Sequence, residues 1–203
     1  MVHGEDLREG VVCSGGVEAV VRFTPFPITE TRNLVLRRIG LDDLDDLFEM
    51  RRDPRMHLHT DTKPDEALDE TKVYIDKTNA GVDAGKWVIW AIGLKGQAKV
   101  IGTISIWNLN PERESGELGY GIIPDYQGRG LMKESLLAVA DYGFDAMNLK
   151  VLEAYTERDN LRSLKLLERC GFAEVDRVDE EGYCNKRTYH MIVYRLESRR
   201  RRA

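Results

Sequence analysis

The segment from Gly119 to Met132 constrains the fold more than any other part of this chain. A strand pattern ends at Pro124, two closely spaced glycines follow, and a helical pattern begins at Leu131. Glycines let the backbone approach a ligand closely, and a helix N-terminus supplies free N–H groups and the positive end of the helix dipole. The segment therefore favours a cradle for a pyrophosphate.

A Gly-x-Gly turn before a helix is weak evidence by itself, because many such turns are only tight connections. Two well-known nucleotide motifs can be set aside. The run from Gly128 to Lys133 lacks the third glycine of a G-x-G-x-x-G fingerprint, and no Ser or Thr follows Lys133 as a P-loop requires.

The remaining patterns predict an α/β domain built on one mixed sheet. We expect helices from 41 to the break at Pro54 and over 64–81, 128–146 and 160–169. Strands are expected over 31–39, 87–94, 100–109, 117–123, 150–156, 172–178 and 187–196. A hairpin followed by a βαβ crossover implies a twisted sheet covered by helices.

The 203 residues predict one domain with modest tails. Residues 30–197 form the domain, residues 1–29 form an extension with one edge strand at 17–21, and residues 198–203 form a basic tail. The chain is 42% apolar and 32% charged, which is too apolar for wholesale disorder. A packed globular fold is expected.

The net charge of −5 arises partly from two acidic groups, Asp42 to Asp46 and Asp179 to Glu181. We interpret both as solvated faces; the functional alternative is an acidic rim that attracts a cationic amine. The run from Arg199 to Arg202 is interpreted as a solvated tail rather than a nucleic-acid or ribosome contact. The negative total charge and the lack of another basic stripe also disfavour nucleic acid as a partner.

The cysteines and the hydropathy pattern predict a cytoplasmic protein. Cys13, Cys170 and Cys184 share no short CxxC spacing, so neither a disulfide framework nor a zinc site is encoded locally. The N-terminus lacks the apolar region of a secretion signal, and no run of about 18 apolar residues occurs. We expect neither secretion nor a membrane span.

Several segments resemble the GNAT superfamily of N-acetyltransferases. Gln127-Gly128-Arg129-Gly130 is similar to the Q/R-x-x-G-x-G/A acyl-CoA loop of that superfamily, with Met132 departing from the last small position. Met at this place is similar to the branch of ribosomal-protein N-terminal (alanine/serine) acetyltransferases. Glu117 to Tyr120, the N-x-x-S run from Asn160 to Ser163, and the Gly171-Phe172 turn after a helix also resemble that branch. The resemblance covers about residues 31 to 196.

The resemblance implies a mostly antiparallel sheet whose fourth and fifth strands splay apart to admit acetyl-CoA as co-substrate. In this picture the backbone of Ile122 and Ile123 pairs with the pantetheine arm, and an N–H near Ile122 stabilises the oxyanion. Asn160 and Ser163 also contact the arm. The pyrophosphate is held by the loop residues Gln127, Gly128, Arg129, Gly130, Leu131 and Met132.

Two residues are candidates for the chemistry. An amine attacks a thioester only when neutral, so a base is needed, and we assign that role to Glu117, acting through water. The alternatives are that Glu117 is a structural carboxylate or only positions the amine. Ser163 is the candidate partner of the departing thiolate, although it also fits a first helical turn capped by Asn160. Leu167 occupies the position at which many superfamily members have a tyrosine that acts as general acid. We therefore assign no tyrosine general acid at this position.

Other reactive residue types receive structural interpretations. Cys170 lies late in an apolar helix without a nearby His, which predicts a buried small residue. His57 and His59 lack further ligands at metal spacing, so we expect loop contacts or solvent exposure, and no metal. Trp87, Trp90 and Trp107 follow the hairpin strands, where large aromatics usually build the core.

We therefore predict an acetyl-CoA-dependent N-acetyltransferase. It would move an acetyl group to a primary amine, on a protein N-terminus or a small molecule, by direct attack in a ternary complex. The alternatives are a non-catalytic acyl-CoA-binding regulator and a transferase that uses another acyl-CoA. The N-terminal extension and the strand edges leave a homodimer open.

Overall fold

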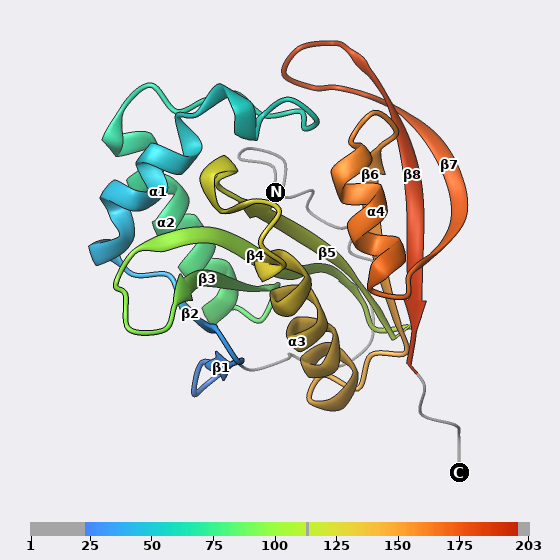
Figure 1. Cartoon of the computed structure of the whole chain (residues 1–203), viewed down its shortest axis with the longest axis horizontal. Coiled ribbons are helices and arrows are strands. Elements are labelled where there is room, and N and C mark those ends of the chain that lie inside the picture. The colour runs from blue at the N-terminus through green and yellow to red at the C-terminus, as the bar shows by residue number, and fades with distance from the viewer. Residues whose placement is uncertain (1–22, 113, 199–203) are drawn as a thin grey trace.

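Eight strands form one sheet in the order β1-β2-β3-β4-β5-β6-β8-β7 (Figure 1). This computed structural model describes residues 23–112 and 114–198. The strands are β1 (Thr29–Glu30), β2 (Leu34–Arg38), β3 (Val88–Leu94), β4 (Val100–Asn110), β5 (Ser115–Ile122), β6 (Val151–Glu157), β7 (Ala173–Glu181) and β8 (Thr188–Glu197). The helices are α1 (Leu44–Arg51), α2 (Leu68–Asp83), α3 (Leu131–Asp145) and α4 (Leu161–Arg169). Neighbouring strands are antiparallel except β5 and β6, which confirms the predicted mixed α/β fold.

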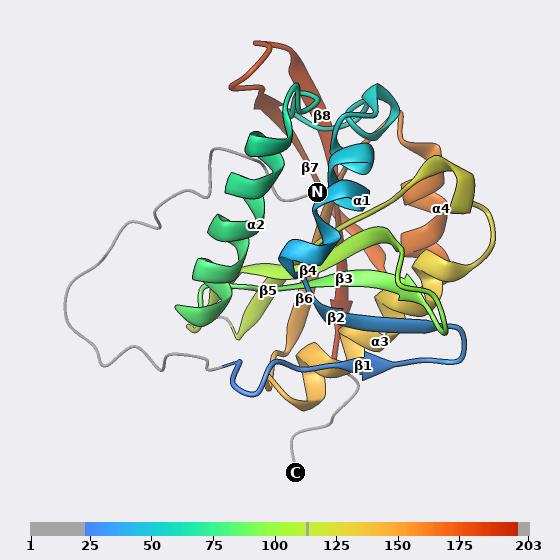
Figure 2. The same cartoon turned by 90° about the vertical axis from the view of Figure 1, so that its left-hand side faces the viewer.

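Helices cover both faces of the sheet centre. Figure 2 shows α1 and α2 on one face and α3 on the opposite face. Because both faces of β3 are covered, every residue from Val88 to Ile92 is buried, and the strand has an apolar run instead of alternation. Trp90 is fully buried and donates its indole N–H to the carbonyl oxygen of Pro27 at 2.6 Å, while Trp87 and Trp107 also pack in or against the core. The structural interpretation of the tryptophans is thereby confirmed.

The long helix α2 differs from its prediction at both ends. Pro64 and Asp65 indicated a helix start, but α2 begins at Leu68, because Asp65 is used elsewhere: its carboxylate pairs with Arg51 at 2.6 Å. Gly81 indicated a stop, yet it lies inside the helix. A Cβ at Gly81 would lie 1.8 Å from the Trp87 ring, so this glycine makes room for the indole and does not end the helix.

The sheet splits between β5 and β6. These strands pair only from Ser115 to Glu117, opposite Val151 to Glu153. Beyond that point β5 stays paired with β4 as far as Ile122, while β6 stays paired with β8 as far as Glu157. The two strands therefore continue past Glu117 and Glu153 without pairing with each other. The splay expected from the family resemblance is confirmed.

One surface prediction is wrong and others lie beyond the described residues. Asp42 and Asp45 are exposed as expected. Asp43 is only 3% exposed, and its carboxylate forms a bidentate ion pair with Arg37. The expected strand at 17–21 and the arginines of the basic tail fall outside the described residues. Within 23–112 and 114–198, the longest helices are too short or too polar to cross a bilayer.

Candidate active site

A glycine-rich loop joins the end of β5 to α3. Gly128 and Gly130 have φ values of +76° and +79°, and a Cβ built on either glycine would meet no heavy atom within 4 Å. Left-handed backbone of this kind favours glycine. It also ends the predicted helix early: α3 begins at Leu131, and not at Gly128, with Gly130 as its N-cap. The loop backbone is therefore exposed to open space, which fits a bulky ligand that approaches closely.

The first turn of α3 offers unpaired donors. The N–H of Glu134 is the first to bond back to the Gly130 carbonyl, at 3.1 Å, so the amides of the three preceding residues have no helical partner. They lie at the positive end of a 15-residue helix. Leu131 and Met132 have side chains that are 8% exposed and pack in the core. These two residues can therefore contact a ligand only through their backbone.

Two polar side chains hold the loop in place. Gln127 donates to the Ile122 carbonyl at 3.1 Å and accepts from Arg162 at 2.5 Å, so it ties the loop to β5 and to α4. Arg129 folds back over the Tyr126 ring and donates to the Asp125 carbonyl at 2.7 Å. Both side chains have structural partners, and Arg129 brings a positive charge to the loop.

The two isoleucines before the loop differ in orientation. Ile123 donates its N–H to the Ile101 carbonyl of β4 at 2.9 Å. Because backbone groups of successive strand residues point to opposite sides, the N–H of Ile122 points away from β4 into the gap. Ile122 is thus the member of the pair whose amide N–H faces the open side of the splay.

The start of α4 brings Asn160 and Ser163 to the gap. Asn160 is the N-cap, and its side-chain oxygen accepts the N–H of Ser163 at 3.2 Å. The Ser163 hydroxyl lies 2.7 Å from the hydroxyl of Tyr120 on β5. Sequence reasoning missed Tyr120 as a site residue, although the alternation of β5 predicts that it shares a face with the buried Leu118. Its distant partner, 43 residues away, could not be read from the pattern.

Glu117 lies at the inner end of the gap, at the last pair between β5 and β6. Burial raises the pKa of this carboxyl from 4.5 to about 7; the nearby carboxylates Glu180 and Glu153 also raise it, and a hydrogen bond from Asn108 at 3.4 Å opposes the rise. A group with this pKa can take up and release a proton near neutral pH. Asn108 is a second residue that sequence reasoning did not assign to the site.

Glu117 and Ser163 lie on opposite faces of the split sheet. Side chains alternate along β5, so Glu117 projects away from the face on which Tyr120 meets Ser163. Glu153 is the register partner of Glu117, and Glu157 follows on the same face of β6. His59, from the connection between α1 and α2, lies 3.7 Å from Glu157. The Glu117 face is thus bordered by that connection.

The same connection is fastened to the hairpin of β7 and β8. Asp61 accepts the backbone N–H groups of Tyr183 and Cys184 at the hairpin turn, and Tyr189 donates its hydroxyl to the Thr60 carbonyl at 3.0 Å. These contacts join segments more than 120 residues apart. The connection and the hairpin therefore lie together beside the Glu117 face. The sequence pattern gives little information about either segment.

The remaining reactive side chains are engaged elsewhere. Cys170 is 8% exposed, and burial raises the pKa of its thiol, so the prediction of a buried small residue is confirmed. His57 lies 2.6 Å from both the Thr62 hydroxyl and the Arg51 carbonyl, which makes it a loop contact. In the described part of the chain, His, Cys, Asp and Glu side chains form no group of three or more that could hold a metal ion.

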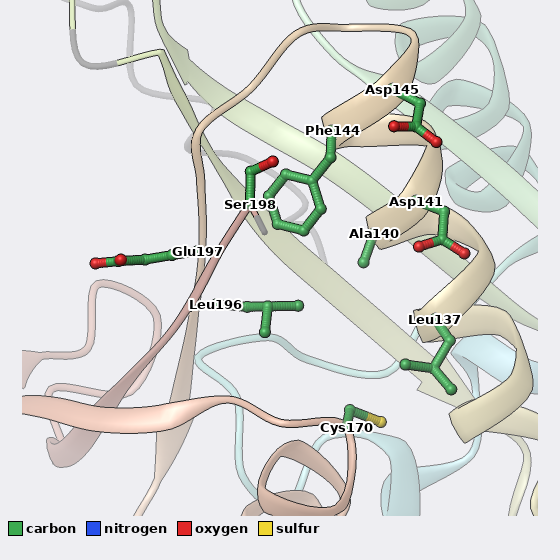
Figure 3. A pocket seen from close by; sticks show the side chains of 9 residues that line it. All are labelled: Leu137, Ala140, Asp141, Phe144, Asp145, Cys170, Leu196, Glu197 and Ser198. Atoms are coloured by element: carbon green, nitrogen blue, oxygen red, sulfur yellow. The ribbon is translucent and has the colours of Figure 1, made fainter. Parts of the chain in front are cut away.

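A separate pocket lies between the second half of α3, the end of α4 and the end of β8 (Figure 3). Phe144 and Leu196 contribute apolar surface, and Asp141, Asp145 and Glu197 contribute carboxylates. None of the predicted site residues lines this pocket. The predicted site residues therefore lie apart from this pocket.

A family model described as the acetyltransferase (GNAT) domain matches residues 33–173, well over half of the chain. This chain belongs to the GNAT acetyltransferase family. The match includes the splay, the glycine loop, Glu117 and Ser163, so these features lie within the family domain.

Individual relatives agree with this assignment. An uncharacterized N-acetyltransferase, YoaA of Bacillus subtilis, is 28% identical over 171 residues, which cover 84% of this GNAT chain and 97% of that protein. A ribosomal-protein-S5-alanine acetyltransferase from Vibrio fischeri superposes with a TM-score of 0.72 at 21% identity, covering 84% and 96% of the two chains. A spermidine N-acetyltransferase from Vibrio cholerae, solved with CoA and spermine, gives a TM-score of 0.72 at 22% identity, covering 82% and 96%. At these identities the two structures show a shared fold.

Proposed function

We propose that this chain transfers an acetyl group from acetyl-CoA to a primary amine by direct attack within a ternary complex. The observation that carries the proposal is the placement of Glu117, with a pKa of about 7, at the inner end of the gap between β5 and β6. The glycine loop and the free amides of α3 stand at the other end of β5. One substrate can thus be bound by backbone groups while the second is deprotonated.

The phosphates of acetyl-CoA would bind the amides of Gly128 to Met132, where the helix dipole and the open space in front of the glycines favour an anion. The pantetheine arm would then lie along the unpaired side of β5, with the Ile122 amide among its partners. Asn160 and Ser163 border the same gap from α4. Met132 contributes through its backbone, because its side chain is in the core.

The acceptor enters as an ammonium ion and must lose a proton before it can attack. Glu117 accepts that proton through water, which leaves a nucleophilic amine on the Glu117 face. As the nitrogen–carbon bond forms, the Ile122 N–H stabilises the negative oxygen of the tetrahedral intermediate. When the carbon–sulfur bond breaks, its electron pair goes to sulfur. Ser163 donates a hydrogen bond to the thiolate from the other face, and the second proton lost by nitrogen ends on sulfur.

The surroundings of Glu117 favour a cationic acceptor. The charges of Glu153 and Glu180 act on the same carboxyl, and opposite charge raises the encounter rate of a cationic amine. The relatives point to two acceptor types, because one neighbouring structure contains spermine and another is a ribosomal-protein-S5-alanine acetyltransferase. Turnover assays with polyamines and with peptides that have a free N-terminus would separate these acceptors.

The binding site is tested by calorimetric titration with acetyl-CoA. We expect saturable binding by the wild type and loss of binding in Gly130→Trp, because an indole would fill the space that the phosphates need. Gly96→Trp is the matched control: Gly96 also has a positive φ, of +76°, and open space around it, but it lies in the turn between β3 and β4. Loss of binding in both variants, or no binding by folded wild type, would contradict the proposed site.

A further inference from the structure

A hydrogen bond between two hydroxyl groups connects β5 to α4 across the splay. The Tyr120 hydroxyl on β5 lies 2.7 Å from the Ser163 hydroxyl on α4. β5 remains attached to β4, whereas α4 follows β6 on the other arm. The bond therefore crosses the gap on the face opposite Glu117, and one of its partners is Ser163, which the proposed mechanism assigns to the leaving thiolate.

The chemistry of the two hydroxyls sets the direction of this bond when a thiolate forms. A serine hydroxyl has one proton, and a hydrogen bond to sulfur uses it. Ser163 can then only accept from Tyr120, so the phenol must be the donor. A phenol is a stronger acid than an alkyl alcohol, which makes it the better donor of the pair. Burial raises the pKa of Tyr120 above its ordinary value of 10, so the phenol keeps its proton.

The backbone of Ser163 is held as well. Its N–H donates to the Asn160 side chain at 3.2 Å, and its side chain is nearly buried. With the backbone fixed by the cap and one lone pair of the hydroxyl oxygen occupied by Tyr120, the serine proton is confined to the remaining directions. A preorganised donor stabilises developing charge better than a freely rotating one.

We propose that Tyr120 is a positioning residue for acetyl transfer: its hydroxyl donates to Ser163 and directs the serine proton toward the departing thiolate. This inference rests on the proposed function, in which Ser163 contacts the thiolate. No proton leaves Tyr120. The electron pair of the broken carbon–sulfur bond stays on sulfur, where the oriented serine hydroxyl hydrogen-bonds to it.

The test measures the steady-state acetylation kinetics of Tyr120→Phe, Ser163→Ala and the double variant. The acceptor is an amine that the wild-type protein acetylates. Tyr120→Phe removes one oxygen and should lower kcat roughly three- to tenfold, the range of one oriented hydrogen bond. Its KM for acetyl-CoA and its calorimetric affinity for CoA should stay within about twofold. In the Ser163→Ala background the same change should lower kcat less than about twofold, because Tyr120 acts through Ser163.

Tyr194→Phe is the matched control. Tyr194 is buried and, like the partly buried Tyr120, bonds to α4, through Glu168 at 3.2 Å, but its bond does not involve Ser163. Its kcat should match the wild type. Wild-type kcat in Tyr120→Phe, an equal loss with and without Ser163, or a loss accompanied by weaker CoA binding would overturn the inference. Absence of any wild-type turnover would instead contradict the proposed function, so the two failures are distinguishable.

Discussion

Replacing Glu117 by Gln should raise the stability of the protein while it lowers activity. The carboxyl has a pKa of about 7 in the folded state and 4.5 ordinarily. The folded state therefore binds more protons than the unfolded state between these values, and stability falls as the pH rises through that window. At about 1.36 kcal/mol per pKa unit, ionised Glu117 costs about 3 kcal/mol at most above pH 7. Residual solvation reduces this to about 1–3 kcal/mol.

The assay is urea unfolding of both proteins at pH 4.5 and pH 8. At pH 8 Glu117→Gln should unfold with a free energy about 1–3 kcal/mol higher than the wild type, because glutamine is neutral. At pH 4.5 the difference should fall to roughly 0.4 kcal/mol, because Glu117 is then protonated in the folded state and half protonated in the unfolded state. Glu112→Gln, on an exposed turn, controls for the loss of one surface charge.

The same substitution tests the base assignment. The wild-type kcat/KM should rise with pH through about 7, because the unprotonated carboxylate is the active form. Glu117→Gln should not show this rise of kcat/KM with pH. Its turnover should be lower by about 10²–10⁴-fold, the usual contribution of a general base. A variant with no gain in stability at pH 8 would refute the raised pKa of the Glu117 carboxyl. If the turnover and the pH profile of the variant are unchanged, Glu117 is not the general base.

Two further predictions concern packing and reactivity. Gly81→Ala should destabilise the fold by about 1–3 kcal/mol, measured by thermal unfolding, because the new methyl would overlap the Trp87 ring; a wild-type melting temperature would contradict this packing. Iodoacetamide should label the exposed Cys184 well before the buried Cys170, whose thiol has a raised pKa. Mass spectrometry of the timed products checks the order, and equal rates would contradict the burial of Cys170.

Local signals in the sequence predicted most of the elements and the glycine-rich loop before α3. Alternating and helical periods indicate strands and helices directly, and a left-handed turn such as that at Gly130 favours glycine whatever surrounds it. The family resemblance supplied Glu117 and Ser163, which the structure brings to the same gap on opposite faces. The mechanism assigned to them stays a proposal.

Long-range contacts decided the rest. Asp65 and Gly81 carry local signals for the start and stop of a helix, but a partly buried partner, Arg51, and a nearby indole, Trp87, override them. Short-range patterns contain no information about which partner arrives from elsewhere in the chain.

The sequence by itself determined the order of the elements, the glycine loop and the family, because these depend on residues that are close together along the chain. Only the tertiary structure decided the raised pKa of Glu117 and the contact between Tyr120 and Ser163. The physical reason is that burial and hydrogen bonding across a gap arise when separate strands and helices pack, and the energies involved depend on distances in space.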